Sequence, residues 1–67
     1  MNIYLITEDG DSFCIRAESM GAAIQVCEDS HMEDCIEQGT EATMKEARLD
    51  YYREVLQNCA LVGELKN

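Results

Sequence analysis

The chain has 67 residues, of which 14 are acidic and five are basic, so its formal net charge is −9. A chain of this length forms one domain with a small core, and its hydrophobic content of 46% without any proline argues against a linker or a disordered tail. The acidic balance excludes direct binding to nucleic acid or to anionic membranes and favours basic protein partners. No apolar run approaches the roughly 20 residues that span a bilayer, and the N-terminus lacks the basic region of a signal peptide, so we expect a cytoplasmic protein.

Residues 2–17 predict an N-terminal β-hairpin. Two β-rich segments flank Asp9 and Gly10, which tolerate the positive φ angles of a type I′ turn. In the resulting register Glu8 lies opposite Asp11, and like charges in direct cross-strand pairs are destabilising by about 0.2–1 kcal/mol. The residues expected on the face that helices cover are Tyr4, Ile6, Phe13 and Ile15.

Three helices are predicted after the hairpin. Ser19 caps a first helix over about 19–29, and a capping-box pattern that begins at Ser30 starts a short second helix over about 31–38, which ends at Gly39. Whether residues 31–38 form this helix or a third strand is left open. The longest helical pattern runs over about 41–62.

These elements predict a single α+β domain over residues 1–67. In this arrangement an N-terminal antiparallel β-hairpin packs against two short helices and one long C-terminal helix.

Four cysteines are spread along the chain: Cys14, Cys27, Cys35 and Cys59. They form no CxxC motif, and without an export signal we expect free thiols that pack as small hydrophobic groups. The nearest approach to a zinc motif is Cys27, His31 and Cys35 at intervals of four residues, with a further cysteine as the fourth ligand. A helix break at residues 29–30 would separate these side chains, so we expect neither a metal nor a cofactor.

No catalytic residues are predicted. A cysteine–histidine nucleophile needs a third orienting group inside a pocket, and acidic surroundings raise the pKa of a thiol rather than lowering it. The adjacent carboxylates show no context that would bury one of them and keep it protonated. We therefore expect a protein that is not an enzyme.

The excess negative charge lies in the first two thirds of the chain. Residues 1–44 hold ten acids and one base, whereas residues 45–67 hold four of each. Either these acids only keep the protein soluble, or they form a functional surface that mimics the phosphates of DNA and occupies a groove of lysines and arginines. We predict the functional surface, formed by Glu8, Asp9, Asp11, Glu28, Asp29, Glu33, Asp34 and Glu37.

In size, charge and expected α+β layout, the whole chain resembles the small acidic phage-borne anti-CRISPR proteins that act on type I systems, type I-C among the candidate subtypes. The resemblance includes no diagnostic motif. It implies a stoichiometric inhibitor in the bacterial host cytoplasm. Such an inhibitor would present acids to a basic nucleic-acid-binding protein of the CRISPR surveillance complex and so block its binding of target DNA.

The alternative is a small protein–protein interaction or regulatory module that acts through an apolar helix face. On this hypothesis the protein forms a homodimer along Tyr51, Val55 and Leu56, whereas the acidic inhibitor is expected to be a monomer.

Overall fold

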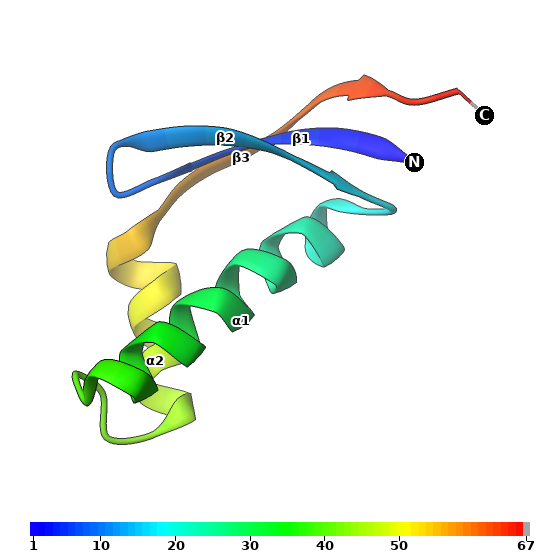
Figure 1. The fold of residues 1–67 in the computed structure, drawn as a ribbon. Coiled ribbons are helices and arrows are strands. Elements are labelled where there is room, and N and C mark those ends of the chain that lie inside the picture. The colour runs from blue at the N-terminus through cyan, green and yellow to red at the C-terminus, as the bar shows by residue number, and fades with distance from the viewer. Residues whose placement is uncertain (67) are drawn as a thin grey trace.

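A computed structural model describes residues 1–66. Its elements follow in the order β1 (Asn2–Glu8), β2 (Asp11–Ala17), α1 (Met20–Gln38), α2 (Met44–Asp50), the π-helical turn η1 (Tyr51–Val55) and β3 (Leu56–Glu64). The three strands form one antiparallel sheet in the order β2-β1-β3, and the two helices project from one side of it as a helical hairpin (Figure 1). The molecule measures 41 × 22 × 15 Å, and its radius of gyration of 12.7 Å exceeds the roughly 11 Å of a compact chain of this length.

The predicted hairpin is confirmed in its register and its turn. Glu8 pairs with Asp11, and both Asp9 and Gly10 have the positive φ angles that a type I′ turn requires, 51° and 86°. Of the expected core face, Tyr4 and Ile6 are buried, whereas Phe13 is 37% exposed because it lies on the edge strand β2.

The two short helices predicted over 19–29 and 31–38 are wrong, because α1 is a single helix of 19 residues. Its ends are as predicted: the Ser19 hydroxyl accepts a hydrogen bond from the Ala22 amide, and Gly39 ends the helix in the left-handed conformation. Ser30 is exposed in the helix interior, where a serine costs less than about 0.7 kcal/mol relative to alanine. That cost is too small to break a helix that is anchored on both sides of Ser30.

The long C-terminal helix predicted over 41–62 is also wrong. The helical segment ends at Val55, and residues 56–64 form β3, which completes the ladder of the central strand β1. Two register shifts interrupt this pairing. The shift between Thr7 and Glu8 places Leu56 opposite Glu8, so the residues opposite the core-facing side of β1 are Leu56, Cys59 and Leu61. Their spacing of three and then two residues hides the strict alternation of a strand and imitates a helical pattern.

The core consists of two separate clusters. The larger lies between the sheet and the helices and contains Tyr4, Ile6, Ala17, Ala23, Cys27 and Tyr51. The smaller lies between the distal parts of α1 and α2 and, within residues 1–66, contains Met32, Cys35 and Ala47. The far end of the helical hairpin is therefore held by little apolar contact.

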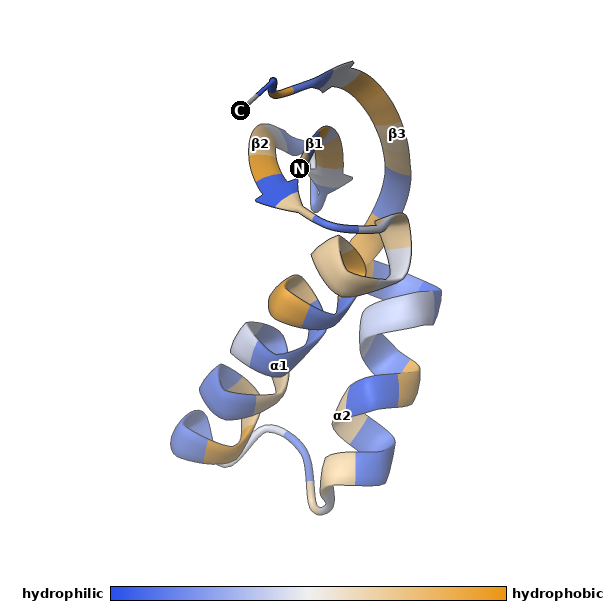
Figure 2. Ribbon diagram, turned by 90° about the vertical axis from the view of Figure 1, so that its right-hand side faces the viewer, coloured by the Kyte–Doolittle hydropathy of each residue, from blue (hydrophilic) through white to orange (hydrophobic). Residues whose placement is uncertain are grey.

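Hydrophilic residues predominate on α2 and on the second half of α1, as Figure 2 shows. Accordingly, neither helix in the described chain combines the length and the apolar character that crossing a membrane requires.

Candidate functional site

The solvent face of α1 carries a row of unpaired acids. Asp29, Glu33 and Glu37 follow one another at intervals of four residues, which places them on one face of the helix, and all three are exposed. Asp34 is exposed beside them. Because the two ion pairs formed within residues 1–66 involve other acids, these four carboxylates have no basic partner in the described chain. We call these four residues the α1 acidic face.

Glu28 does not join this face, although the sequence placed it there. Its side chain is buried, and one carboxylate oxygen lies 2.8 Å from Nε of Arg48 on α2. The neighbouring Glu28 carboxylate, with partial burial, raises the pKa of the Tyr52 hydroxyl. Glu28 therefore links α1 to α2 rather than facing a partner.

The tip of the hairpin presents two of its three predicted acids. Asp9 and Asp11 are exposed, but the turn is tied to the C-terminal part of the chain. The Asp9 amide donates to the Val55 carbonyl at 3.0 Å, and the Gly10 amide donates to Oε1 of Gln57 at 3.3 Å. Hydrogen bonds to residues 55 and 57 therefore hold the tip of the hairpin against the chain at the start of β3.

Glu8 points to the core side of the sheet, because it shares the face of Tyr4 and Ile6. Its Oε2 atom and the Tyr51 hydroxyl are both buried, and neither has a hydrogen-bond partner among residues 1–66. The pKa of Tyr51 is raised well above its ordinary value of 10.0, mainly by burial and to a lesser extent by the neighbouring Cys27 and Glu8. Burial likewise raises the pKa of the Cys27 thiol. These three groups make a polar spot inside the larger core.

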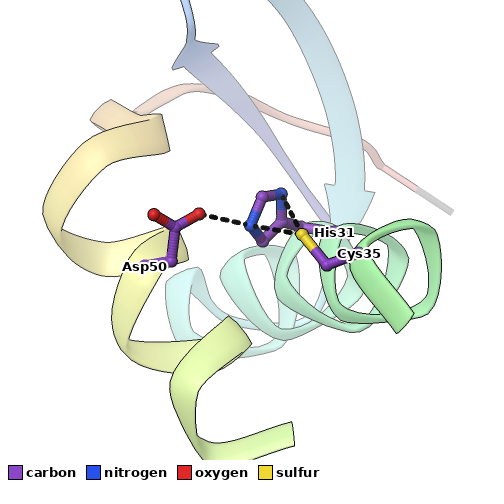
Figure 3. Close-up of side chains that lie close together, drawn as sticks. All are labelled: His31, Cys35 and Asp50. Atoms are coloured by element: carbon purple, nitrogen blue, oxygen red, sulfur yellow. Dashed lines mark hydrogen bonds and ion pairs between the residues drawn. The ribbon is translucent and has the colours of Figure 1, made fainter. Parts of the chain in front are cut away.

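A second cluster joins the helices at His31, Cys35 and Asp50 (Figure 3). The His31 Nε2 atom lies 2.9 Å from Oδ2 of Asp50 and 3.3 Å from Sγ of Cys35. One donor atom from each residue lies within 4.8 Å of the other two. Cys35 is buried and the other two are half-buried, so the cluster sits at the edge of the structure where solvent still reaches it.

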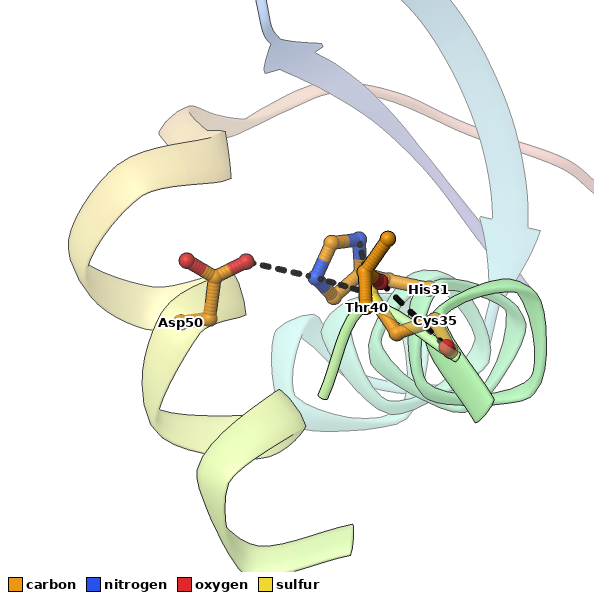
Figure 4. A network of polar contacts seen from close by, with 4 residues as sticks. All are labelled: His31, Cys35, Thr40 and Asp50. Carbon is orange, nitrogen blue, oxygen red and sulfur yellow. Dashed lines mark hydrogen bonds and ion pairs between the residues drawn. The ribbon is translucent and has the colours of Figure 1, made fainter. Parts of the chain in front are cut away.

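The continuity of α1 brings this cluster together. In one unbroken helix His31 and Cys35 are neighbours on the same face, one turn apart. Ala47 of α2 is fully buried against Cys35, and its small side chain lets the helices approach; Asp50 follows it by three residues on the same face. Beyond the helix end, the Thr40 amide and hydroxyl both donate to the Cys35 carbonyl, at 3.0 and 3.3 Å (Figure 4).

Sequence reasoning found two of these three residues and missed Asp50. The spacing from His31 to Cys35 was noted, but the helix break expected at residues 29–30 placed His31 at a helix end on the surface. Its ring instead packs against Tyr51, with ring centroids 5.5 Å apart. No local pattern points to Asp50, because the packing of α2 on α1 alone brings it to His31.

An open pocket of about 250 Å³ adjoins the cluster on the α2 side. Asp50 is shared between the pocket and the cluster, and three further carboxylates and one base line the pocket: Glu41, Glu46, Glu54 and Arg53. The excess of carboxylates in this pocket favours the approach of a cation over that of an anion.

The cluster does not have the geometry of a nucleophilic triad. In such a triad the thiol and the carboxylate contact opposite ring nitrogens of the histidine, so that a proton can pass on one side while the other side is held. Here both Cys35 and Asp50 approach Nε2, whereas Nδ1 lies 4.0 Å from the sulfur. The three donor atoms instead lie within 4.8 Å of one another on one side of the cluster.

The apolar helix face of the alternative hypothesis lies largely inside the molecule. Tyr51 is fully buried, and Val55 and Leu56 pack against the same core cluster. These three residues are therefore not a free surface for a homodimer.

Comparisons with protein-family models, with curated proteins and with solved structures found no match for this chain. The fold and the two sites define a small α+β protein with an acidic helical hairpin on one side of a three-stranded sheet.

Proposed function

We propose that the protein is a non-enzymatic inhibitor that binds a basic nucleic-acid-binding protein through the α1 acidic face, with Asp9 and Asp11 of the hairpin tip as a second point of contact. The observation that carries this proposal is the row of four exposed carboxylates on α1 without a basic partner among residues 1–66. A partner lined with lysines and arginines would supply the missing counter-charges.

The spacing of the row suits a groove that normally holds a nucleic-acid backbone. Residues four apart in an α-helix are separated by about 6 Å along its axis, so Asp29, Glu33 and Glu37 place charges at regular steps over about 12 Å. A helix holds these charges rigidly, and cationic grooves bind regular phosphate charges in the same way.

The acids occupy positions that do not favour the helix itself. Like charges four residues apart repel each other, and the last turn of α1 contains Glu37 and no base, although a helix C-terminus favours cations. The first turn, where acids would stabilise α1, contains none. A need for solubility alone would be met by acids at less costly positions, so this distribution supports a binding role.

The resemblance to anti-CRISPR proteins suggests the partner. We propose the DNA-binding surface of a type I CRISPR surveillance complex, encountered in the bacterial cytoplasm, with type I-C as the first subtype to examine. Occupation of that surface would exclude target DNA by charge competition, without any chemical step.

The proposal is tested by displacement of target DNA from a purified type I-C surveillance complex, followed by electrophoretic mobility. The parent protein is compared with Asp29→Asn/Glu33→Gln/Glu37→Gln. A matched control neutralises three exposed acids elsewhere: Glu18→Gln/Glu54→Gln/Glu64→Gln. Both variants have a formal net charge of −6 instead of −9, so a difference between them reports position rather than total charge.

We expect the parent and the control to displace DNA at similar concentrations and the α1 variant to require much more protein, with the difference shrinking at high salt. Equal displacement by all three proteins would exclude the α1 acidic face. Displacement by none of them would exclude this partner.

A further inference from the structure

We propose that His31, Cys35 and Asp50 form a binding site for one zinc-like divalent transition metal, which fastens α2 to α1. The ligand atoms are Nε2 of His31, Sγ of Cys35 as the thiolate and Oδ2 of Asp50. The fourth position is open to water. This site is supported by observations that do not depend on the proposed binding of a basic partner.

The first argument is the gathering of three potential donor atoms around the His31 ring. In the plane of an imidazole ring, Nε2 offers a single position, which holds either a hydrogen or a lone pair. Asp50 lies 2.9 Å from Nε2, whereas the Cys35 sulfur lies 3.3 Å from Nε2 and 4.0 Å from Nδ1, so it sits over the ring and off the axis of either nitrogen. A metal ion on Nε2 would bind the Asp50 oxygen and, after rotation of the Cys35 side chain, the sulfur as well.

The distances agree with this arrangement. Zinc bond lengths of about 2.0–2.3 Å with tetrahedral angles place ligand atoms about 3.4–3.6 Å apart. The observed separations of 2.9 and 3.3 Å and the overall limit of 4.8 Å require changes of up to about 1.4 Å, which lie within the range of side-chain rotation. A nitrogen, a sulfur and a carboxylate oxygen form a ligand set typical of zinc and unsuited to calcium or magnesium.

The surroundings hold the ligands in place. His31 and Cys35 stand one turn apart on a continuous helix, and the two hydrogen bonds from Thr40 fix the backbone at Cys35 (Figure 4). The His31 ring is packed against Tyr51. Asp50 shares the adjoining pocket with three further carboxylates, which favour the approach of a cation to it.

The fold explains what such a metal would do. The distal helical hairpin is held by a core cluster of only three residues, and small domains with so little core often depend on a metal or a disulfide. A metal bound to both helices stabilises the folded state, because the unfolded chain does not hold the three ligands together.

The test is a titration of reduced, chelator-treated protein with Co²⁺, a spectroscopic substitute for zinc. We expect saturation at one Co²⁺ per chain, with the visible bands of tetrahedral cobalt and a thiolate-to-cobalt charge-transfer band. Addition of Zn²⁺ should abolish both bands and raise the melting temperature.

Two variants and a control assign the site. Cys35→Ser should remove the charge-transfer band, and Asp50→Asn should retain it while weakening binding by at least roughly 10–100-fold, the range that loss of a supporting group already costs. Cys14→Ser, which changes an exposed thiol elsewhere, should behave as the parent. Circular dichroism of each metal-free variant shows whether it is folded.

Absence of saturable binding by the parent would overturn the proposal, as would loss of the charge-transfer band in Cys14→Ser. If Cys35→Ser does not fold, the parent titration and Asp50→Asn decide: unchanged affinity in Asp50→Asn would overturn this ligand set.

Discussion

The α1 acidic face should lower the stability of the protein that carries it. We consider the variant Glu33→Gln/Glu37→Gln, which removes two exposed charges and leaves the shape of both side chains almost unchanged. If the acids are kept for binding, their removal should stabilise the fold while it weakens the proposed interaction.

The magnitude follows from the positions of the two residues. Glu33 lies four residues from both Asp29 and Glu37, so the variant removes two repulsive pairs, each worth about 0.2–0.5 kcal/mol. Glu37 also lies in the last turn of α1, where a negative charge opposes the helix dipole by about 0.3–1 kcal/mol. The free energy of unfolding should therefore rise by about 0.7–2 kcal/mol at low salt.

The assay is urea denaturation followed by circular dichroism at low and high salt. The matched control, Glu18→Gln/Glu64→Gln, also brings the net charge from −9 to −7. It leaves the repulsive pairs between Asp29, Glu33 and Glu37 intact, and it removes an acid just before the N-cap Ser19, where a negative charge favours the helix. The control should be no more stable than the parent. The reasoning is refuted if both variants gain equally, or if the gain of the α1 variant persists unchanged at about 1 M salt, where charge interactions are screened within about 3 Å.

Three further predictions concern the interior. Tyr51→Phe deletes a buried hydroxyl that has no hydrogen-bond partner among residues 1–66, so it should change the free energy of unfolding by less than about 1 kcal/mol in thermal or urea denaturation. Tyr51→Ala should lower the free energy of unfolding by about 3–5 kcal/mol. Similar losses in both variants would show that the hydroxyl forms a hydrogen bond. Because the pKa values of Cys27, Cys59 and Tyr51 are raised in the folded protein, the folded state keeps protons that the unfolded state loses, so stability is complete below about pH 9 and falls above it by up to about 1.4 kcal/mol per pH unit for each group; the double variant Cys27→Ala/Cys59→Ala should delay the onset toward pH 10, and an unchanged onset in a pH series of urea denaturation would contradict this assignment. Arg48→Ala should lower the free energy of unfolding by about 1–2 kcal/mol, because it leaves the buried Glu28 carboxylate unpaired while Arg48 itself is largely exposed. The additional change Glu28→Gln should restore stability in urea denaturation. A double variant no more stable than Arg48→Ala would argue against this ion pair.

The proposed metal site bears on how the acidic face is presented. The second half of α1, which carries Glu33, Asp34 and Glu37, is the part that the small distal core holds. A metal at His31, Cys35 and Asp50 would fix this half against α2, and a rigid row of charges binds with a smaller loss of conformational freedom. Binding of a basic partner should therefore be measured with and without added zinc.

Local chemistry allowed several features to be predicted from the sequence. The turn at Asp9 and Gly10 sets the hairpin register, Ser19 caps α1, and Gly39 ends it, since each of these depends on residues within a few positions. The absence of any base but Arg16 in residues 1–44 likewise required that the acids of α1 be left largely unpaired by their own neighbours.

Long-range packing decided the rest. Residues 56–64 show a helical spacing of apolar side chains, yet they pair with β1, because a central strand needs hydrogen-bond partners on both sides and the register shift between Thr7 and Glu8 brings Leu56 and Cys59 to the side of the core.

The same difference explains the two sites. The row of acids on α1 follows from sequence spacing once the helix is known to be continuous, and all of its members were already among the surface acids predicted from the sequence. The contact of Asp50 with His31 lies between residues 19 apart, and it arises only where Ala47 lets α2 settle on α1. The sequence by itself therefore determined the charges and the local turns and caps, whereas the tertiary structure alone decided which polar groups converge, because convergence depends on packing between elements.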